Sequence, residues 1–214
     1  PLVPTPSDFG LRAETPIQLE LLDYLAARFM DDGWSVKKLH RLILLSSAYQ
    51  QSSRDHPAYA RSDPENKYLW RVNRRRLDFE ALRDSLLAIS TNLDLSIAGQ
   101  PLDITTNAPV GRRTVYGYVD RQDLPNLFRV FDFANPDTSS PQRFQTIVAP
   151  QALYLLNSQF VIERVKGLVQ RAQDSPAAAT QSRTTPEEQQ IRRLYQLLFQ
   201  RDPSRDEIKL AREF

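Results

Sequence analysis

The sequence predicts a mainly α-helical fold: a helical domain with a loop-rich insert that carries one short strand or hairpin. Several separate stretches place apolar residues at the three- and four-residue spacing of an amphipathic helix. The chain has only six glycines, and six of its fifteen prolines lie between residues 99 and 150. Within that proline-rich region, residues 112–121 alternate valine and tyrosine in the manner of a strand.

The N-terminal part predicts two helices that form a short antiparallel hairpin. In the first, Thr15 is the capping residue and Gly33 ends the helix. Its expected apolar stripe is Leu19, Leu22, Ala26 and Phe29. Ser35 is expected to cap the second helix. There His40 lies at the edge of the apolar side with no second histidine or carboxylate at helical spacing, which favours a structural histidine over a base or metal ligand.

A third amphipathic helix is predicted over residues 77–94, after a polar loop from 50 to 66. Its expected buried stripe is Phe79, Leu82, Leu86 and Ile89. Arg83 and Asp84 lie within one turn of Asp78, Glu80 and Leu87, so local ion pairs are available to them.

The remaining chain predicts an insert over about 99–150, a helix over 149–173 and a final pair of helices. The expected apolar side of the 149–173 helix is Leu153, Leu156, Phe160, Val161, Val165 and Leu168. The final helices break at Asp202-Pro203, with Ser204 or Asp202 as the cap. This gives a domain over 1–172, a linker over 173–185 and a truncated C-terminal helical pair over 186–214.

Composition narrows the possible functions. The formal net charge is +2 and 28 basic residues are interleaved with 26 acidic ones, so no basic face for nucleic acid is expected. No apolar run approaches the roughly 20 residues that cross a bilayer, so no membrane insertion is expected. Cysteine is absent. Disulfides, thiol nucleophiles and a Cys-x-x-Cys-His haem site are therefore excluded, and no cofactor is expected within this segment.

An arginine cluster is the first candidate for a binding site. Its members could clamp an anionic ligand such as a sulfate, a uronate or a haem propionate. The candidate ligand-binding residues are Arg74, Arg75, Arg76, Arg112, Arg113 and Arg143. The alternative is that these guanidiniums pair inside the fold with carboxylates, for which Asp78, Glu80, Asp120 and Asp132 are available.

Aspartates in the insert are the second candidate. Asp120 and Asp132 are the candidate catalytic residues, because a pair of carboxylates is what glycoside hydrolysis requires. The alternative is that they are turn residues. No metal site is expected, since His-x-x-x-His and His-x-x-Glu spacings are missing. The sequence leaves open whether the domain is an enzyme.

Four stretches, taken together, resemble a known family. They are "TPSDFGLRAETPIQLELLDYLAARFMDDGWSVKKLHRLILLSSAYQQSS", "DPENKYLWRVNRRRLDFEALRDSLLAIS", "RRTVYGYVDR" with "FDFANPD", and "QRFQTIVAPQALYLLNSQFV". They resemble the planctomycete-type domain of unknown function found at the C-terminal end of large exported proteins with a cytochrome c-like domain. The resemblance covers most of residues 4–165 in the same order.

The resemblance implies export to a periplasm-like compartment and a haem domain elsewhere in the parent chain. It supplies no catalytic residues. We therefore expect a non-catalytic interaction or scaffolding domain, whose partners are the haem and other domains of the same parent chain. A domain that binds or hydrolyses polysaccharide, with the aspartates and arginines around a pocket, is the alternative.

Overall fold

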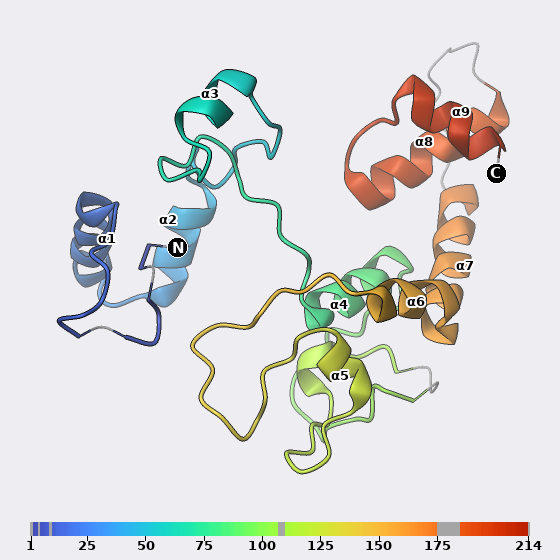
Figure 1. The fold of residues 1–214 in the computed structure, drawn as a ribbon. Helices are drawn as coiled ribbons and strands as arrows, with labels where there is room; N and C mark the ends of the chain where they lie inside the picture. The colour runs from blue at the N-terminus through green and yellow to red at the C-terminus, as the bar shows by residue number, and fades with distance from the viewer. Residues whose placement is uncertain (1, 4, 9, 107–109, 175–184, 214) are drawn as a thin grey trace. The chain divides into compact units, whose positions relative to one another are not determined.

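Helices dominate the computed structural model, which describes residues 2–3, 5–8, 10–106, 110–174 and 185–213 (Figure 1). The mainly α-helical fold is confirmed. In chain order the elements are α1 (Leu19–Asp31), α2 (Val36–Leu44), α3 (Pro57–Ser62), α4 (Phe79–Ile89), the 3-10 helix η1 (Thr114–Tyr116), α5 (Asn126–Val130), α6 (Ala149–Asn157), α7 (Gln159–Asp174), α8 (Pro186–Phe199) and α9 (Arg205–Glu213).

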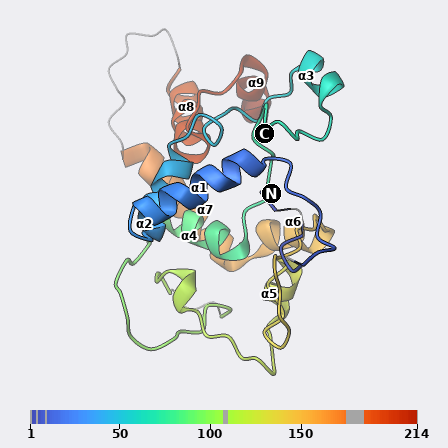
Figure 2. The ribbon, with the colours of Figure 1, turned by 90° about the vertical axis from the view of Figure 1, so that its left-hand side faces the viewer.

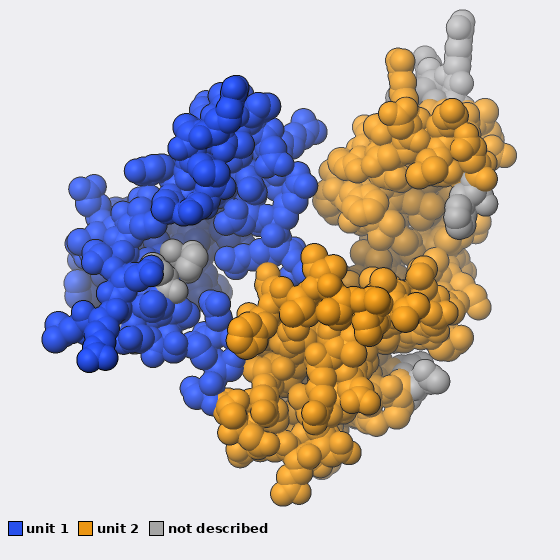
Figure 3. Space-filling view, in the orientation of Figure 1, with its two compact units in different colours: residues 1–76, 139–142 blue, residues 77–138, 143–214 orange. Residues whose placement is uncertain are grey.

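The chain divides into two compact units (Figure 3). Unit 1 comprises residues 1–76 and 139–142, and unit 2 comprises residues 77–138 and 143–214. The linker expected over 173–185 lies mostly outside the described residues. The boundaries drawn from the sequence remain a prediction. No helix among the described residues is both long and apolar enough to span a bilayer.

In unit 1, α1 and α2 form the predicted hairpin. Gly33 has a φ of 71°, and Trp34 N–H donates to the carbonyl of Phe29 at 2.9 Å, which closes the end of α1. Ser35 Oγ accepts from Lys38 N–H at 3.4 Å, so the predicted cap of α2 is confirmed. However, α1 begins four residues after Thr15. Gln18 is its capping position, and the side chain of Gln18 donates to the carbonyl of Lys67.

Unit 1 has almost no interior of its own. Asn66 is its only buried residue among those that the structure describes. Neither α1 nor α2 contains a buried residue. In the apolar stripe of α1, Leu22 and Phe29 are half-buried, whereas Leu19 is 49% exposed. His40 is exposed as well. Because few apolar side chains are covered, packing contributes little to the stability of this unit.

Side-chain hydrogen bonds hold residues 63–71 of unit 1 in place. The carboxylate of Asp63 accepts the backbone N–H groups of Lys67 and Tyr68, each at 2.9 Å. Asn66, with a φ of 54°, donates from Nδ2 to the carbonyl of Arg71 at 2.7 Å. These bonds give partners to backbone N–H and C=O groups of a turn, which has no helix or sheet to provide them.

Unit 2 contains the hydrophobic core. Its buried members are Phe79, Ile104, Leu124, Phe128 and Phe131. The ring centroid of Phe79 on α4 lies 5.3 Å from that of Phe128 and 5.4 Å from that of Phe131. Such aromatic pairs stabilise a core beyond the area that they bury. The insert therefore packs on the first turn of α4 and supplies most of the core.

The buried side of α4 differs from the predicted one. Phe79, Arg83 and Leu87 are buried, whereas Leu82 and Leu86 are half-buried. Arg83 is 3% exposed and donates from Nη1 to the carbonyl of Arg112 at 2.9 Å, and from Nη2 to that of Val110 at 2.7 Å. Among the described residues, Arg83 thus uses its guanidinium for hydrogen bonds to the insert and not for a local ion pair. Burial lowers the pKa of this guanidinium below its ordinary value.

The predicted strand over 112–121 is also wrong. Among the described residues, this segment forms η1 and takes part in two isolated bridges, Asp94 with Arg112 and Leu102 with Gly117. The reason lies at Thr114, whose backbone N–H donates to Asp84 Oδ1 at 2.7 Å. This N–H therefore cannot donate to a neighbouring strand in a β-ladder. At Gly117 a Cβ atom would lie 2.5 Å from Ile104 Cδ1 and 3.0 Å from the Thr114 carbonyl oxygen, so a larger residue would force its neighbours to shift.

The helix expected over 149–173 is two helices. Ser158, with φ −69° and ψ 125°, separates α6 from α7. Val161 and Leu168 are buried as predicted, but Leu153, Leu156 and Val165 are exposed. Within unit 2, α7 packs against α4, α6 and α8, as the two ribbon views show (Figures 1 and 2).

The last two helices match their prediction. Helix α8 ends before Asp202-Pro203, and Ser204 Oγ accepts from Glu207 N–H at 3.2 Å at the start of α9. Glu207 Oε2 accepts from Ser204 N–H at 2.7 Å, which completes a capping box. Arg201 binds both oxygens of the same carboxylate, at 2.9 and 2.7 Å.

Because of the ion pair at the start of α9, we expect the stability of the fold to depend on pH. The hydrogen bond from Arg201, followed by that from the Ser204 backbone, lowers the pKa of Glu207 to about 2. In the unfolded chain a glutamate titrates near pH 4.3, at roughly its reference pKa. The depressed pKa thus stabilises the fold above that pH, and this contribution is lost as the pH falls toward 2. A carboxyl NMR titration should show the low pKa, and Arg201→Gln should raise it; an unchanged pKa would refute the assignment.

We expect that shortening the side chain of Arg83 causes a large loss of stability. Arg83→Ala leaves three acceptors, one of them buried and two half-buried, without their donor, so the free energy of unfolding of unit 2 should fall by about 3 kcal/mol. Both tryptophans, Trp34 and Trp70, lie in unit 1, so urea unfolding should be followed by far-UV circular dichroism. Exposed Arg75→Ala is the control and should change stability by less than about 0.5 kcal/mol. Equal effects of the two substitutions would contradict the central position of Arg83.

Candidate functional site

The predicted arginine cluster is divided between the two units. Arg74, Arg75 and Arg76 belong to unit 1, and Arg112, Arg113 and Arg143 belong to unit 2. The Nη2 atom of Arg74 lies 4.0 Å from Asp55 Oδ2 and donates to the carbonyl of Ser53 at 3.3 Å. Arg75 is exposed and Arg76 is half-buried. Binding of an anion by these residues remains a prediction.

Arg112 serves the loop that contains it. Its guanidinium lies 4.1 Å above the ring of Tyr116, and its Nη2 donates to the carbonyls of Ser96 and Ala98. These contacts fix residues 96–98 beside the segment that Arg83 holds. The position of Arg112 is therefore explained by internal contacts.

Arg113 and Arg143 do come together, in a shallow pocket of about 350 Å³ on the first half of α4. Its lining residues are Asp78, Glu80, Ala81, Asp84, Arg113, Val115 and Arg143. We call it the α4 pocket. Helix α4 contributes Glu80 and Asp84, which are four residues apart and so lie on one side of the helix, and Asp78 is its capping residue. Sequence reasoning found both arginines of this pocket.

Ion pairs occupy both guanidiniums of the α4 pocket. Arg113 Nε lies 3.2 Å from Asp84 Oδ2, and Arg143 Nη1 lies 2.8 Å from Glu80 Oε2. The hydrogen bond to Glu80 is the main reason why the pKa of Arg143 is raised. Three carboxylates against two guanidiniums leave the pocket slightly acidic. This arrangement does not favour an anion, and it provides no histidine or cysteine as a nucleophile or base.

Asp84 does more than pair with Arg113. Its Oδ1 atom accepts both the backbone N–H of Thr114, at 2.7 Å, and the Thr114 hydroxyl, at 2.6 Å. Together with its neighbour Arg83, it holds residues 110–114 from two sides. The sequence contained a signal for this: Arg83 stands midway between Phe79 and Leu87 on one helical stripe, where its side chain points to the core.

Neither of the two candidate catalytic aspartates lines the α4 pocket. Asp120 Oδ1 accepts the N–H of Gln122 at 2.8 Å. Asp132, whose φ is 58°, accepts the N–H and the hydroxyl of Thr146, both at 2.8 Å. The bond of Asp120 is the one that aspartates in turns commonly make, whereas Asp132 joins two segments that lie fourteen residues apart in the chain. A role for them in glycoside hydrolysis remains a prediction.

Histidine contributes to no metal centre among the described residues, where no group of three His, Cys, Asp or Glu side chains could hold an ion. His56 stacks on Tyr59 with ring centroids 4.4 Å apart, at the first turn of α3.

Comparison with known proteins identifies the family of the chain and gives no specific function. The family whose sequence model matches residues 1–214 is described as PSD1, a protein of unknown function (DUF1553). No curated protein and no solved structure matches the chain.

The α4 pocket predicts that its carboxylates differ in importance. Asp84→Ala removes the acceptor of a Thr114 hydrogen-bond pair and should lower the free energy of unfolding by about 2 kcal/mol. Asp78 makes no side-chain capping bond, so Asp78→Asn should change stability by less than about 0.5 kcal/mol. Urea unfolding followed by circular dichroism measures both. Similar losses of unfolding free energy at the two positions would show that Asp84 has no special structural role.

Proposed function

We propose that this chain, which belongs to the PSD1 family of proteins of unknown function (DUF1553), is a non-catalytic interaction domain. It packs against neighbouring domains of its own parent protein and holds them in place. The proposal explains two features together: charged groups that are used inside the fold, and apolar groups that the fold leaves uncovered.

A long segment without charge is the observation that carries the proposal. Residues 144–162 contain no Asp, Glu, Lys, Arg or His, although one residue in four of the whole chain is charged. Four large apolar side chains of this uncharged segment stand well exposed: Phe144 at 80%, Ile147 at 90%, Leu153 at 56% and Leu156 at 74%. Exposed apolar surface of this kind marks a surface for a protein partner.

Unit 1 supports the same proposal independently. Its helices α1 and α2 bury no residue, while Tyr24, Met30 and Trp34 are each more than half exposed. A hairpin with an amphipathic sequence normally covers its apolar side with another element. A neighbouring domain would provide that cover.

The internal use of charge supports a role without catalysis. Arg113, Arg143 and Asp84 are engaged in ion pairs, and Asp132 is bonded to Thr146. A general base needs a carboxylate or histidine that is directed at a substrate. In the α4 pocket Asp84, Arg113 and Arg143 are instead engaged in contacts within the fold.

The identity of the neighbouring domain follows from the family resemblance. A cytochrome c-like haem domain of the same parent protein is the proposed partner, in a periplasmic or otherwise exported protein. This chain has no cysteine, so covalent haem attachment would belong to that other domain. Contact between the two domains would then be apolar, and it would be insensitive to salt because few charges take part.

A binding experiment with matched variants tests the proposal. The chain and the separately expressed haem domain of its parent should associate in isothermal titration calorimetry. The double variant Ile147→Gln with Leu156→Gln should weaken the association at least roughly tenfold, because two apolar contacts of more than about 1 kcal/mol would be lost. Added salt should have little effect on the affinity.

The control is chosen for equal exposure. Ile97 and Leu210 are 88% and 69% exposed, close to the values for Ile147 and Leu156. The double variant Ile97→Gln with Leu210→Gln should bind as tightly as the unchanged chain. The proposal fails if no association occurs, or if both double variants bind alike. Binding of a polysaccharide that is lost in Asp120→Asn with Asp132→Asn would favour the carbohydrate alternative instead.

A further inference from the structure

Residues 144–148, at the start of the uncharged segment, have the character of a β-strand. They run into α6 without a helix or turn of their own (Figure 1). Val148 has φ −127° and ψ 150°, which are values typical of strands. The sequence of the five residues is Phe-Gln-Thr-Ile-Val, and all but the glutamine are residue types that strands favour. We call residues 144–148 the edge segment.

One edge of this segment is bonded to the fold. Thr146 donates its backbone N–H to Asp132 Oδ2 at 2.8 Å, and its carbonyl accepts from Gln151 Nε2 at 3.2 Å. The N–H of Val148 donates to Gln151 Oε1 at 3.4 Å. Gln151 is buried, and its Nε2 also donates to the carbonyl of Val130 at 2.8 Å, so its amide is fixed in place. These two side chains therefore hold the backbone at alternate residues.

The opposite edge of the segment is open. In an extended chain the backbone groups of successive residues point to opposite sides, so those of Gln145 and Ile147 point away from Asp132 and Gln151. Neither Gln145 nor Ile147 makes a backbone hydrogen bond to a described residue, and both are exposed. Their N–H and C=O groups thus form a row with the spacing that a neighbouring strand would match.

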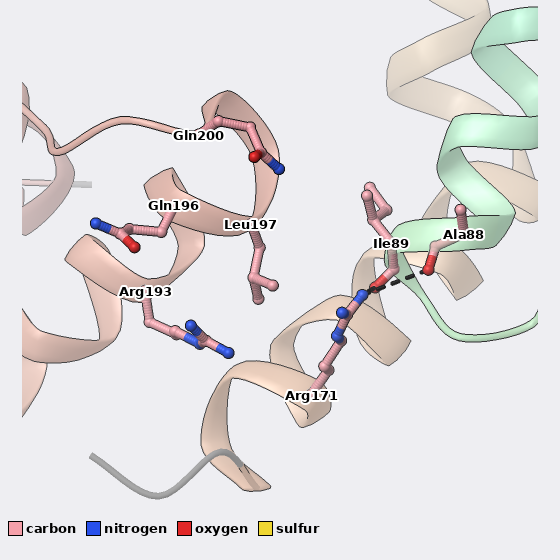
Figure 4. Close-up of a pocket in the computed structure, with 7 residues that line it drawn as sticks. All are labelled: Ala88, Ile89, Arg171, Arg193, Gln196, Leu197 and Gln200. Atoms are coloured by element: carbon pink, nitrogen blue, oxygen red, sulfur yellow. Dashed lines mark hydrogen bonds between the residues drawn. The ribbon is translucent and has the colours of Figure 1, made fainter. Parts of the chain in front are cut away.

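The end of α4 shows a different treatment of backbone groups within unit 2. Figure 4 shows Arg171 at a pocket of about 420 Å³ beside this helix end. Its Nη1 donates to the carbonyl of Ile89 at 2.9 Å and to that of Ala88 at 3.4 Å. No described side chain does the same for Gln145 or Ile147. A partner for the open edge therefore has to come from outside the described residues.

The edge segment also lacks the protection that exposed edges usually carry. Proteins commonly place charged residues or prolines on a free edge, because an unprotected edge pairs with other chains. Residues 144–149 contain no charged residue and no proline. Phe144 and Ile147, whose side chains point to opposite faces of an extended chain, are 80% and 90% exposed. A strand that covers both side chains needs apolar residues on both of its faces.

We propose that the edge segment accepts a strand of the neighbouring domain by β-strand addition. The backbone of that strand exchanges hydrogen bonds with Gln145 and Ile147, and its apolar side chains cover Phe144 and Ile147. Asp132 and Gln151 act as positioning residues, because they hold the edge segment with its open side outward. This inference rests on the proposed function and specifies its contact: the partner presents an extended, uncharged strand.

Proline at position 145 tests the pairing through the backbone. Gln145→Pro removes an N–H that has no partner among the described residues, and proline is compatible with an edge strand. In isothermal titration calorimetry it should weaken association with the separately expressed haem domain of the proposed parent at least roughly tenfold, because a backbone hydrogen bond is lost. Gln145→Ala keeps the N–H, so it is the matched control and should bind like the unchanged chain. Urea unfolding of the three proteins should be the same.

Amide hydrogen exchange of the complex provides a second measurement. The N–H groups of Gln145 and Ile147 should change from fast to slow exchange on binding. Those of Thr146 and Val148, which already have partners in the fold, should change much less. Equal changes at all four residues would contradict the pairing of one edge.

The outcomes separate this inference from the proposed function. If Gln145→Pro binds as tightly as Gln145→Ala while Ile147→Gln with Leu156→Gln still binds weakly, strand addition is overturned and the domain contact stands. If no association occurs at all, both are overturned. Dimerisation of the chain alone that Gln145→Pro abolishes would assign the edge to a second copy and overturn its assignment to the neighbouring domain.

Discussion

The structure of unit 2 depends on one buried cation, the guanidinium of Arg83. Its three hydrogen bonds among the described residues go to the carbonyls of Val110 and Arg112 and to the hydroxyl of Thr114. It also lies 5.1 Å from the centroid of the Phe160 ring on α7. Removing a charge from water is costly, and these contacts offset that cost only while all of them are in place. Arg83 therefore ties α4, the insert and α7 into one arrangement.

Asp84 extends this constraint to the outer side of α4. Its bonds with Thr114 and Arg113 place the insert so that Phe128 and Phe131 can reach Phe79. The α4 pocket is a consequence of the same contacts, because its guanidiniums are those that pair with the carboxylates of α4. Charge in this part of the molecule thus serves the fold. The fold leaves exposed the apolar surface of the uncharged segment and of the α1–α2 hairpin. This is the surface to which we assign the proposed partner.

The sequence predicted the features that depend on near neighbours. Gly33, Ser35 and Ser204 act within one turn of where they stand, so their capping could be inferred from spacing alone. The environment of Arg83 could not, because its acceptors lie 27 to 31 residues away in the chain. The same long-range contacts explain the missing strand. Residues 114–118 have the alternation of a strand, but Asp84 binds the Thr114 amide that a ladder would need.

Amide hydrogen exchange, compared between the isolated chain and the longer parent protein that we propose, tests the central claim most directly. If the Arg83 contacts make unit 2 self-sufficient, the amides of residues 79–90 and 110–117 should exchange equally slowly in both proteins. If the proposed neighbouring domain covers them, the uncharged segment 144–162 and the hairpin of α1 and α2 should be better protected in the parent. Equal exchange of these two regions in both proteins would contradict the account, since nothing would then cover the apolar surface.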